Sequence, residues 1–186
     1  MPPLKIIVLL NYKIKEQKMI EVIKTLYSYD SWATERLLNA MGQLTKEQYN
    51  EHGCNGPDSI KNVFAQHLSY NYGWIGWLDG QLTPEQSLVQ HFKPEDIETV
   101  AQAKEKWTEV HKAMHHYISK LPEKHLHEIK PFASEWINLS LPLYDLVINV
   151  AVQGIHTRAQ IVSGIRRFGL DAGQYEMNRF SLKEKA

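Results

Sequence analysis

The sequence predicts an all-α fold, a four-helix bundle with long connections. Four long segments place their apolar residues at helical spacing, Gly- and Pro-rich stretches separate them, and no internal repeat or low-complexity tract is present. A length of 186 residues suits one domain with a full core. We therefore expect a bundle over residues 19–170, an N-terminal extension over residues 1–18 and a C-terminal tail over residues 171–186.

The first two helices follow from their apolar faces and from the turn residues that bound them. The first is expected over residues 20–41, where apolar residues recur on one face at 100° per residue. A loop rich in Gly, Asn and Pro covers residues 50–59, and either Asp58 or Ser59 can cap the second helix. We expect that helix to end near Asp79.

The third helix is expected from near Glu95 to Leu121. Its apolar residues step by three and four, the heptad spacing of helices that pack in bundles. This seam consists of Val100, Ala103, Trp107, Val110, Met114, Tyr117 and Leu121. The connection that follows, residues 124–141, has mixed character, and we expect it to be irregular or partly extended.

The fourth helix is expected from around Pro142 to Gly169, with two apolar stripes about 100° apart. The first stripe comprises Leu143, Leu146, Val147, Val150 and Ile161. The second comprises Ile148, Ala151, Ile155 and Val162. A helix that is apolar on two sides buries both. The second stripe can meet the connection after the third helix or a second subunit, and we predict a homodimer through it.

Composition argues against several functional classes. Lys and Arg together number 21, as do Asp and Glu, so no net positive charge attracts nucleic acid or an anionic membrane. No apolar run approaches the roughly 20 residues of a membrane-spanning helix. The single cysteine, Cys54, cannot form an internal disulfide, which favours the reducing cytoplasm.

The N-terminal extension has three interpretations. Residues 4–10 are almost all apolar, but the run is too short for a signal peptide and lacks a cleavage site. It can be a short strand or a disordered extension. Alternatively, Lys15-Glu16-Gln17-Lys18 can be encoded by a purine-rich stretch that resembles a bacterial ribosome-binding site. In that case Met19 is the natural start and residues 1–18 are translated leader.

Four polar residues lie on the inward faces of the first two helices. His67 is at the centre of the apolar face of the second helix, with Asn71 one turn further on, and Asp30 and Thr34 fall inside the apolar face of the first. Buried polar groups require partners. His67 is either a neutral core histidine with one hydrogen-bonded partner or part of a functional site. Asp30 either accepts a hydrogen bond from His67 or meets solvent at the helix surface.

Two further polar residues, Gln153 and Thr157, share one face of the fourth helix at the edge of its first stripe. We predict that they converge with Asp30, Thr34, His67 and Asn71 in one pocket. His156 points away from the stripe and is expected to be exposed.

The histidines of the third helix resemble a metal motif only in their spacing. His111 and His115 are four residues apart, but His111 flanks the apolar seam and His115 and His116 face outward. We therefore expect solvated surface histidines there.

Three segments resemble the DinB family, also described as DinB/YfiT-like proteins. They are YSYDSWATERLLNAM, SIKNVFAQHLSYNYGWIGWLDG and QGIHTRAQIVSGIRRFGL, in order and on three helices. The third is similar to the segment His-Gly-x-x-His-Arg-Gly-Gln followed by Leu-Arg-x-x-Gly. The resemblance covers about residues 19–170 and implies a four-helix bundle that usually binds a divalent metal through three histidines.

Residue by residue, only one of those histidines is present. The resemblance carries the first ligand onto His67, but Gln153 and Thr157 stand where the two ligands of the fourth helix are expected. An imidazole with a neutral amide and a hydroxyl is a poor transition-metal site. We expect no tightly bound cofactor and at most a weakly held Zn²⁺ or Ni²⁺.

Two functions remain open. The first is a DinB-like protein with a degenerate metal site that binds a small ligand in the polar pocket or is not catalytic. The second, implied by the resemblance, is a metal- or thiol-dependent transferase, isomerase or hydrolase. In that case Asp30 and His67 are the candidate catalytic residues, acting as a base pair in place of the metal. The sequence leaves open whether the chain is an enzyme.

Overall fold

The computed structural model describes residues 18–53 and 58–183. The proposed translated leader falls almost entirely within residues 1–17, and Cys54 belongs to the other gap. Both expectations therefore concern residues outside the described ranges.

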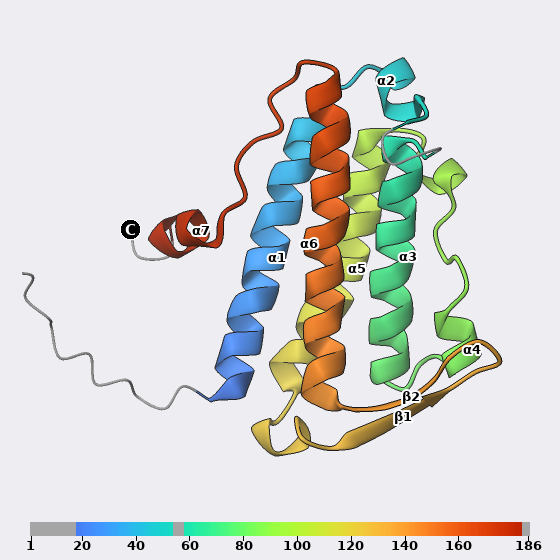
Figure 1. Cartoon of the computed structure of the whole chain (residues 1–186), viewed down its shortest axis with the longest axis vertical. Helices are drawn as coiled ribbons and strands as arrows, with labels where there is room; N and C mark the ends of the chain where they lie inside the picture. The colour runs from blue at the N-terminus through green and yellow to red at the C-terminus, as the bar shows by residue number, and fades with distance from the viewer. Residues whose placement is uncertain (1–17, 54–57, 184–186) are drawn as a thin grey trace, which may run out of the picture.

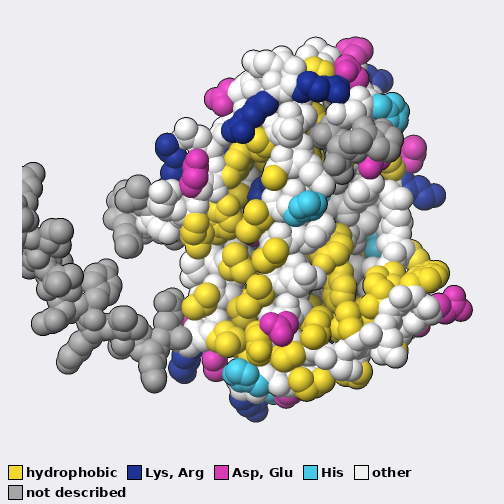
Figure 2. All heavy atoms as spheres, viewed as in Figure 1, with side chains coloured by type: hydrophobic (Ala, Val, Ile, Leu, Met, Phe, Trp, Pro, Cys, Tyr) yellow, Lys and Arg dark blue, Asp and Glu magenta, His cyan; other side chains and the backbone are white. Residues whose placement is uncertain are grey.

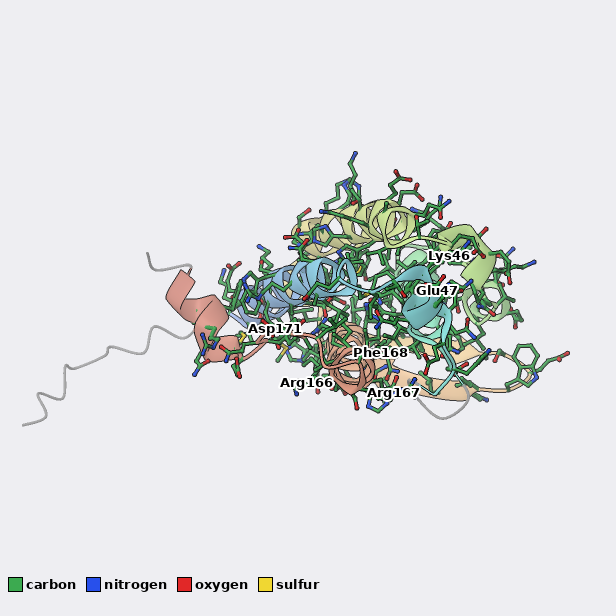
Figure 3. The ribbon with its side chains drawn as sticks, turned by 90° about the horizontal axis from the view of Figure 1, so that it is seen from above. Lys46, Glu47, Arg166, Arg167, Phe168 and Asp171 are labelled. Carbon is green, nitrogen blue, oxygen red and sulfur yellow. The ribbon has the colours of Figure 1, made fainter. Side chains whose placement is uncertain are left out.

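Four long helices form the bundle: α1 (Met19–Met41), α3 (Ile60–Leu78), α5 (Val100–Lys120) and α6 (Leu143–Arg167). Helices α1 and α6 run in one direction and α3 and α5 in the other, so the connection after α3 returns along the outside of the bundle (Figure 1). Each helix packs against two others, and α1 faces α3 across the centre. The end-on view shows the same arrangement, with Arg166 and Phe168 at the end of α6 (Figure 3). The all-α bundle is confirmed.

Shorter elements occupy the connections. These are α2 (Lys46–Asn50), α4 (Pro84–Ser87), η1 (Pro94–Ile97), η2 (Glu123–His125), β1 (Ile129–Ala133), β2 (Asn138–Pro142) and α7 (Met177–Lys183). None of them carries a residue of the predicted pocket.

Side-chain caps set where the second and third long helices begin. The Ser59 hydroxyl accepts a hydrogen bond from the Asn62 amide at 3.1 Å, as one of the two predicted caps for α3. Thr99 and Gln102 form a capping box that starts α5. The expected start near Glu95 was therefore wrong, since that residue lies in the separate turn η1.

The predicted seam of α5 is buried except at Val100 and Tyr117, which are partly buried. Ala103, Trp107, Val110 and Met114 are all in the core, but in the last turn Ile118 is buried and Tyr117 is only partly buried. A straight helix has 3.6 residues per turn, so its buried face drifts away from a strict heptad.

Residues 129–142 form an antiparallel hairpin that covers one end of the bundle (Figure 1). Phe132 is fully buried, stacked on Trp74 with ring centroids 5.2 Å apart and set edge-on against Trp77 at 4.8 Å. Trp136, close to the turn, is 71% exposed. The expectation of a partly extended connection is confirmed.

Both apolar stripes of α6 pack largely within this chain, because α6 lies between α1 and α3. In the second stripe Ala151 and Val162 are buried, Ile148 is partly buried against the core and Ile155 is 43% exposed. The expectation of a contiguous exposed patch was therefore wrong. The homodimer stays a prediction, and on α6 its apolar contact would rest on Ile155 and the exposed Val152. Figure 2 shows hydrophobic side chains over this face and along the hairpin.

The described part of the C-terminal tail packs against α1. The Tyr29 hydroxyl donates to the Tyr175 carbonyl at 2.6 Å. Phe180 is buried against the rings of Tyr29 and Trp32, with centroids 6.0 Å and 5.8 Å away. Residues 171–180 therefore form one wall over α1 and α6. Among the described helices, none is long and apolar enough to cross a membrane.

The hairpin provides a test of the packing. Phe132→Ala removes a fully buried ring and should lower the free energy of unfolding by about 3–5 kcal/mol. Trp136→Ala, in the same hairpin but exposed, should change it by less than about 0.5 kcal/mol. Urea unfolding of both variants measures the difference, and equal costs would contradict the packing described.

Candidate functional site

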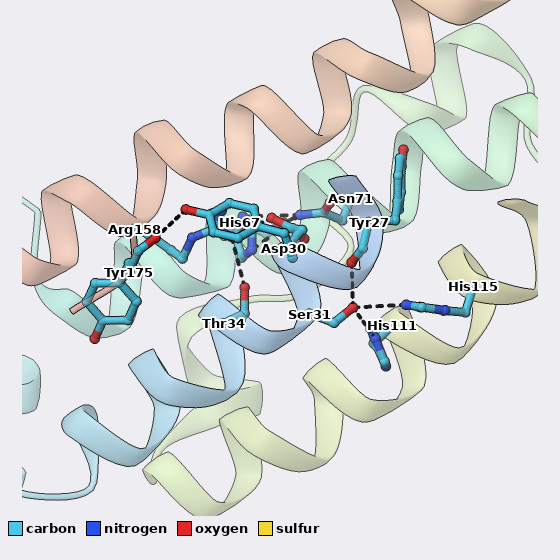
Figure 4. A network of polar contacts seen from close by, with 11 residues as sticks. Tyr27, Asp30, Ser31, Thr34, His67, Asn71, His111, His115, Arg158 and Tyr175 are labelled. Atoms are coloured by element: carbon cyan, nitrogen blue, oxygen red, sulfur yellow. Dashed lines mark hydrogen bonds and ion pairs between the residues drawn. The ribbon is translucent and has the colours of Figure 1, made fainter. Parts of the chain in front are cut away.

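A buried ion pair joins α1 to α6 at mid-height. The Arg158 guanidinium, 3% exposed, donates through Nη1 to Oδ1 of Asp30, which is 1% exposed. The same nitrogen lies 3.1 Å from the Thr34 hydroxyl. Figure 4 shows Arg158 reaching from α6 toward both residues of α1. Asp30 therefore accepts from Arg158, and among the described residues no hydrogen bond joins it to His67.

Gly154 allows this close approach. A Cβ atom at this position would lie 2.5 Å from Asp30 Oδ1 and 3.2 Å from Arg158 Nη1. The missing side chain gives the carboxylate room beside the backbone of α6. The ion pair therefore requires a residue without a side chain at position 154.

His67 and Asn71 of α3 lie close to this ion pair. Together with Asp30, Thr34 and Arg158 they form a polar layer inside the bundle (Figure 4). The Asn71 amide nitrogen donates to the His67 carbonyl at 2.8 Å and lies 3.1 Å from its Nδ1. The other face of the layer is aromatic, because the His67 ring stacks on Trp107 with centroids 5.5 Å apart and planes 19° apart. His67 is 2% exposed, so its position on the buried face of α3 is confirmed.

Three buried atoms of this layer make no hydrogen bond to other described residues: Asp30 Oδ2, Arg158 Nη2 and Asn71 Oδ1. Buried polar atoms nearly always have a partner. The layer therefore has one unused donor, on Arg158, and two unused acceptors, on Asp30 and Asn71. These atoms lie close to the opposite charges of Arg158 and Asp30.

Burial shifts the protonation equilibria of the layer. It lowers the pKa of His67 from 6.5 to about 3, with a further contribution from the nearby Arg158 charge. Burial also raises the pKa of the Asp30 carboxyl, and this effect is opposed by Arg158. At neutral pH His67 is therefore an uncharged imidazole.

The remaining predicted pocket residues lie on α6. Thr157 is buried and Gln153 is half-buried, and neither side chain forms a hydrogen bond with another described residue. On the α1 side, Asp30 and Thr34 are joined by Arg158 of α6. The convergence of all six residues in one pocket stays a prediction. Arg158 is not among the residues predicted from the sequence, although an arginine next to Thr157 on an inward face could have signalled a partner such as Asp30.

Two histidines expected on the surface lie instead at the α1–α5 interface. His111 and His115 are half-buried, and both contact the Ser31 hydroxyl through Nε2. The prediction was wrong for them because α5 packs against α1 as well as α3, so the flank of its seam is also covered. His116 and His156 are exposed, as expected.

Arg158 also contributes to a surface cleft of about 300 Å³ between α6 and the C-terminal segment. Its walls include Tyr29, Ile155 and Val162, with Arg166 and Tyr175. The Arg158 guanidinium lies over the Tyr29 ring, 5.6 Å from its centroid. Figure 4 shows Tyr175 next to Arg158. The cleft thus combines apolar walls with two guanidinium groups.

The DinB family model matches residues 17–184, nearly the whole chain. The chain belongs to the DinB family. Among solved structures it is similar to a DinB-like protein from Bacillus cereus ATCC 10987, with 18% sequence identity and a TM-score of 0.57. That likeness covers 84% of this chain and 97% of the other, and it supports the fold. No functionally curated protein matches the chain.

The side chains of this DinB protein do not fit the family's three-histidine metal. The second and third ligand positions carry Gln153 and Thr157, and Nδ1 of His67 is occupied by the Asn71 amide. Within the described ranges no group of three or more His, Cys, Asp and Glu side chains could hold a metal ion.

The ion pair predicts a strong coupling between its members. Arg158→Met leaves a buried carboxylate unpaired and should lower the free energy of unfolding by about 3–5 kcal/mol. Adding Asp30→Asn should recover at least about 1 kcal/mol of this loss, because no buried charge then remains. Urea unfolding of the wild type, both single variants and the double variant gives the coupling energy. Additive costs would contradict a direct ion pair.

His67 predicts a pH dependence of stability. Its folded pKa of about 3 lies below 6.5, so the unfolded chain binds more protons between these values. The resulting stability is complete above pH 6.5 and is lost as pH falls toward 3. His67→Gln should reduce the slope between pH 6 and pH 4 by about 1.4 kcal/mol per pH unit. The exposed His156→Gln is the control, and an unchanged slope in His67→Gln would refute the assignment.

Proposed function

We propose that this DinB protein binds a small organic anion, a carboxylate with an apolar body, in the cleft between α6 and the C-terminal segment. The observation that carries the proposal is Arg158 Nη2, a buried guanidinium nitrogen without a protein partner among the described residues, on a residue that lines this cleft. A carboxylate is the natural partner of such a donor.

The charges around the cleft support an anionic ligand. Arg158 is neutralised by Asp30, so the net positive charge comes from Arg166, which has no ion pair among the described residues. The acidic residue of the lining, Glu176, pairs with Arg179 at 3.2 Å. A bound carboxylate would meet the guanidinium groups of Arg158 and Arg166, and the negative charge of Glu176 is already neutralised by Arg179.

The walls support an apolar body on the ligand. Ile155, Ala159 and Val162 of α6 and the rings of Tyr29 and Tyr175 surround the charged groups. Binding sites for small molecules commonly have this composition, mostly apolar with a few polar groups that fix orientation. A volume of about 300 Å³ suits a small acid.

The alternative, a metal- or thiol-dependent transferase, isomerase or hydrolase, has less support. It needs either the three-histidine metal, which the side chains do not fit, or Asp30 and His67 as a base pair. Asp30 is bonded to Arg158, and His67 is buried against Trp107. A general base must reach the proton it removes.

The test uses benzoate and hexanoate, with benzamide and hexanamide as neutral analogues, against the full chain. Titration followed by NMR chemical shifts should show saturable binding of an acid but not of its amide. Arg166→Gln should weaken binding by about tenfold or more, the loss of one charge-assisted hydrogen bond.

The matched control is Arg167→Gln. Arg167 is the next residue of α6, but its guanidinium bonds Glu51 at 2.6 Å and the Gly53 carbonyl at 3.0 Å, away from the cleft. This variant should bind the acids as the wild type does. Equal binding of acid and amide, or no effect of Arg166→Gln, would refute the proposal.

A further inference from the structure

A second polar cluster, distinct from the Arg158 cleft, lies between α1 and α5. His111 and His115 are on successive turns of α5, and their rings are 4.3 Å apart between centroids. Both direct Nε2 at the same atom, Ser31 Oγ on α1, at 2.9 Å for His115 and within hydrogen-bond contact for His111. Figure 4 shows the two imidazoles meeting at Ser31.

The hydrogen bonds of Ser31 leave it as an acceptor toward both rings. Its hydroxyl donates to the Tyr27 carbonyl one turn earlier, at 2.8 Å. Its one proton is therefore used, and its lone pairs face the two Nε2 atoms. Two imidazole nitrogens and one hydroxyl oxygen thus converge on a small volume.

Packing holds this arrangement in place. Trp107 stacks on His111 with ring centroids 5.6 Å and planes 29° apart, and it also stacks on His67 with centroids 5.5 Å apart. Ser31 is fixed on the buried face of α1, 9% exposed. His111 and His115 are only half-buried, so a small ion can reach them from solvent.

We propose that His111, His115 and Ser31 bind a divalent first-row transition-metal ion. Imidazole is a preferred ligand of Zn²⁺, Ni²⁺ and Cu²⁺, and histidines four residues apart on a helix present their rings to one ion. Each neutral ring would carry its proton on Nδ1 and offer Nε2 to the metal. Ser31 Oγ and water complete the coordination sphere.

This site is separate from the family's metal position, which belongs to α3 and α6. It has two nitrogen ligands, and the described residues supply no third His, Cys, Asp or Glu to it. We therefore expect affinity in the micromolar rather than the nanomolar range, with Cu²⁺ bound more tightly than Zn²⁺ or Ni²⁺.

The experiment is calorimetric titration of the full chain, free of any metal-binding tag, with ZnCl₂ and with NiCl₂. One ion should bind per chain. His111→Ala and His115→Ala should each weaken binding at least about tenfold, since losing even an outer partner of a metal ligand costs that much. His116→Ala, which removes the exposed neighbour on α5, should leave binding unchanged.

A second measurement does not depend on the variants folding. Electron paramagnetic resonance of the wild type with one equivalent of Cu²⁺ should show coupling to two imidazole nitrogens. The absence of imidazole coupling would overturn the proposal. So would zinc binding that survives the His111→Ala and His115→Ala double variant, because another group would then hold the ion.

Discussion

The buried ion pair between Asp30 and Arg158 is the constraint on which the interior of this bundle depends. Neither charge can stay in a low-dielectric interior alone, since the desolvation of each costs several kcal/mol. The pair therefore ties α1 to α6 at one height and one rotation. Thr34 adds a second acceptor from α1, and Gly154 supplies the space that the carboxylate needs.

The ion pair also sets the charges in the interior of the bundle. Gln153 and Thr157 stand at the family's ligand positions, and the next residue, Arg158, brings a positive charge into the central layer. Burial, and in addition that charge, lower the pKa of His67 and so favour its neutral form. The unpartnered atoms Asp30 Oδ2 and Arg158 Nη2 remain beside it, and they support the proposal that the protein recognises anionic groups.

The helices and the buried faces of α1 and α3 could be predicted from sequence, because their period and caps are local properties. The helical period of 100° per residue is enough to predict that Asp30, His67 and Asn71 lie on apolar faces, and all three are buried. Their partners could not be found in this way. Arg158 reaches Asp30 across 128 positions of sequence, and helical arithmetic places residues on one helix only.

The errors have the same origin. His115 was assigned to the surface because a single seam was assumed for α5, whereas α5 packs against two helices. The second stripe of α6 was expected to be a contiguous exposed patch because helical arithmetic does not show that α6 packs against both α1 and α3, nor that the C-terminal segment lies beside Ile155 and Val162. That segment is held by contacts such as Tyr29 with Tyr175 and Phe180, which depend on the fold already formed.

The most direct test of the central claim is NMR of the Arg158 side chain in protein labelled with ¹⁵N at arginine. A guanidinium held between Asp30 and Thr34 should show hindered rotation, separate Nη–H signals and slow exchange with water, and Asp30→Asn should shift them. The exposed Arg166, which has no ion pair among the described residues, provides the reference for a freely rotating guanidinium. One averaged Arg158 signal in rapid exchange with water, unchanged by Asp30→Asn, would contradict a buried ion pair at the centre of this fold.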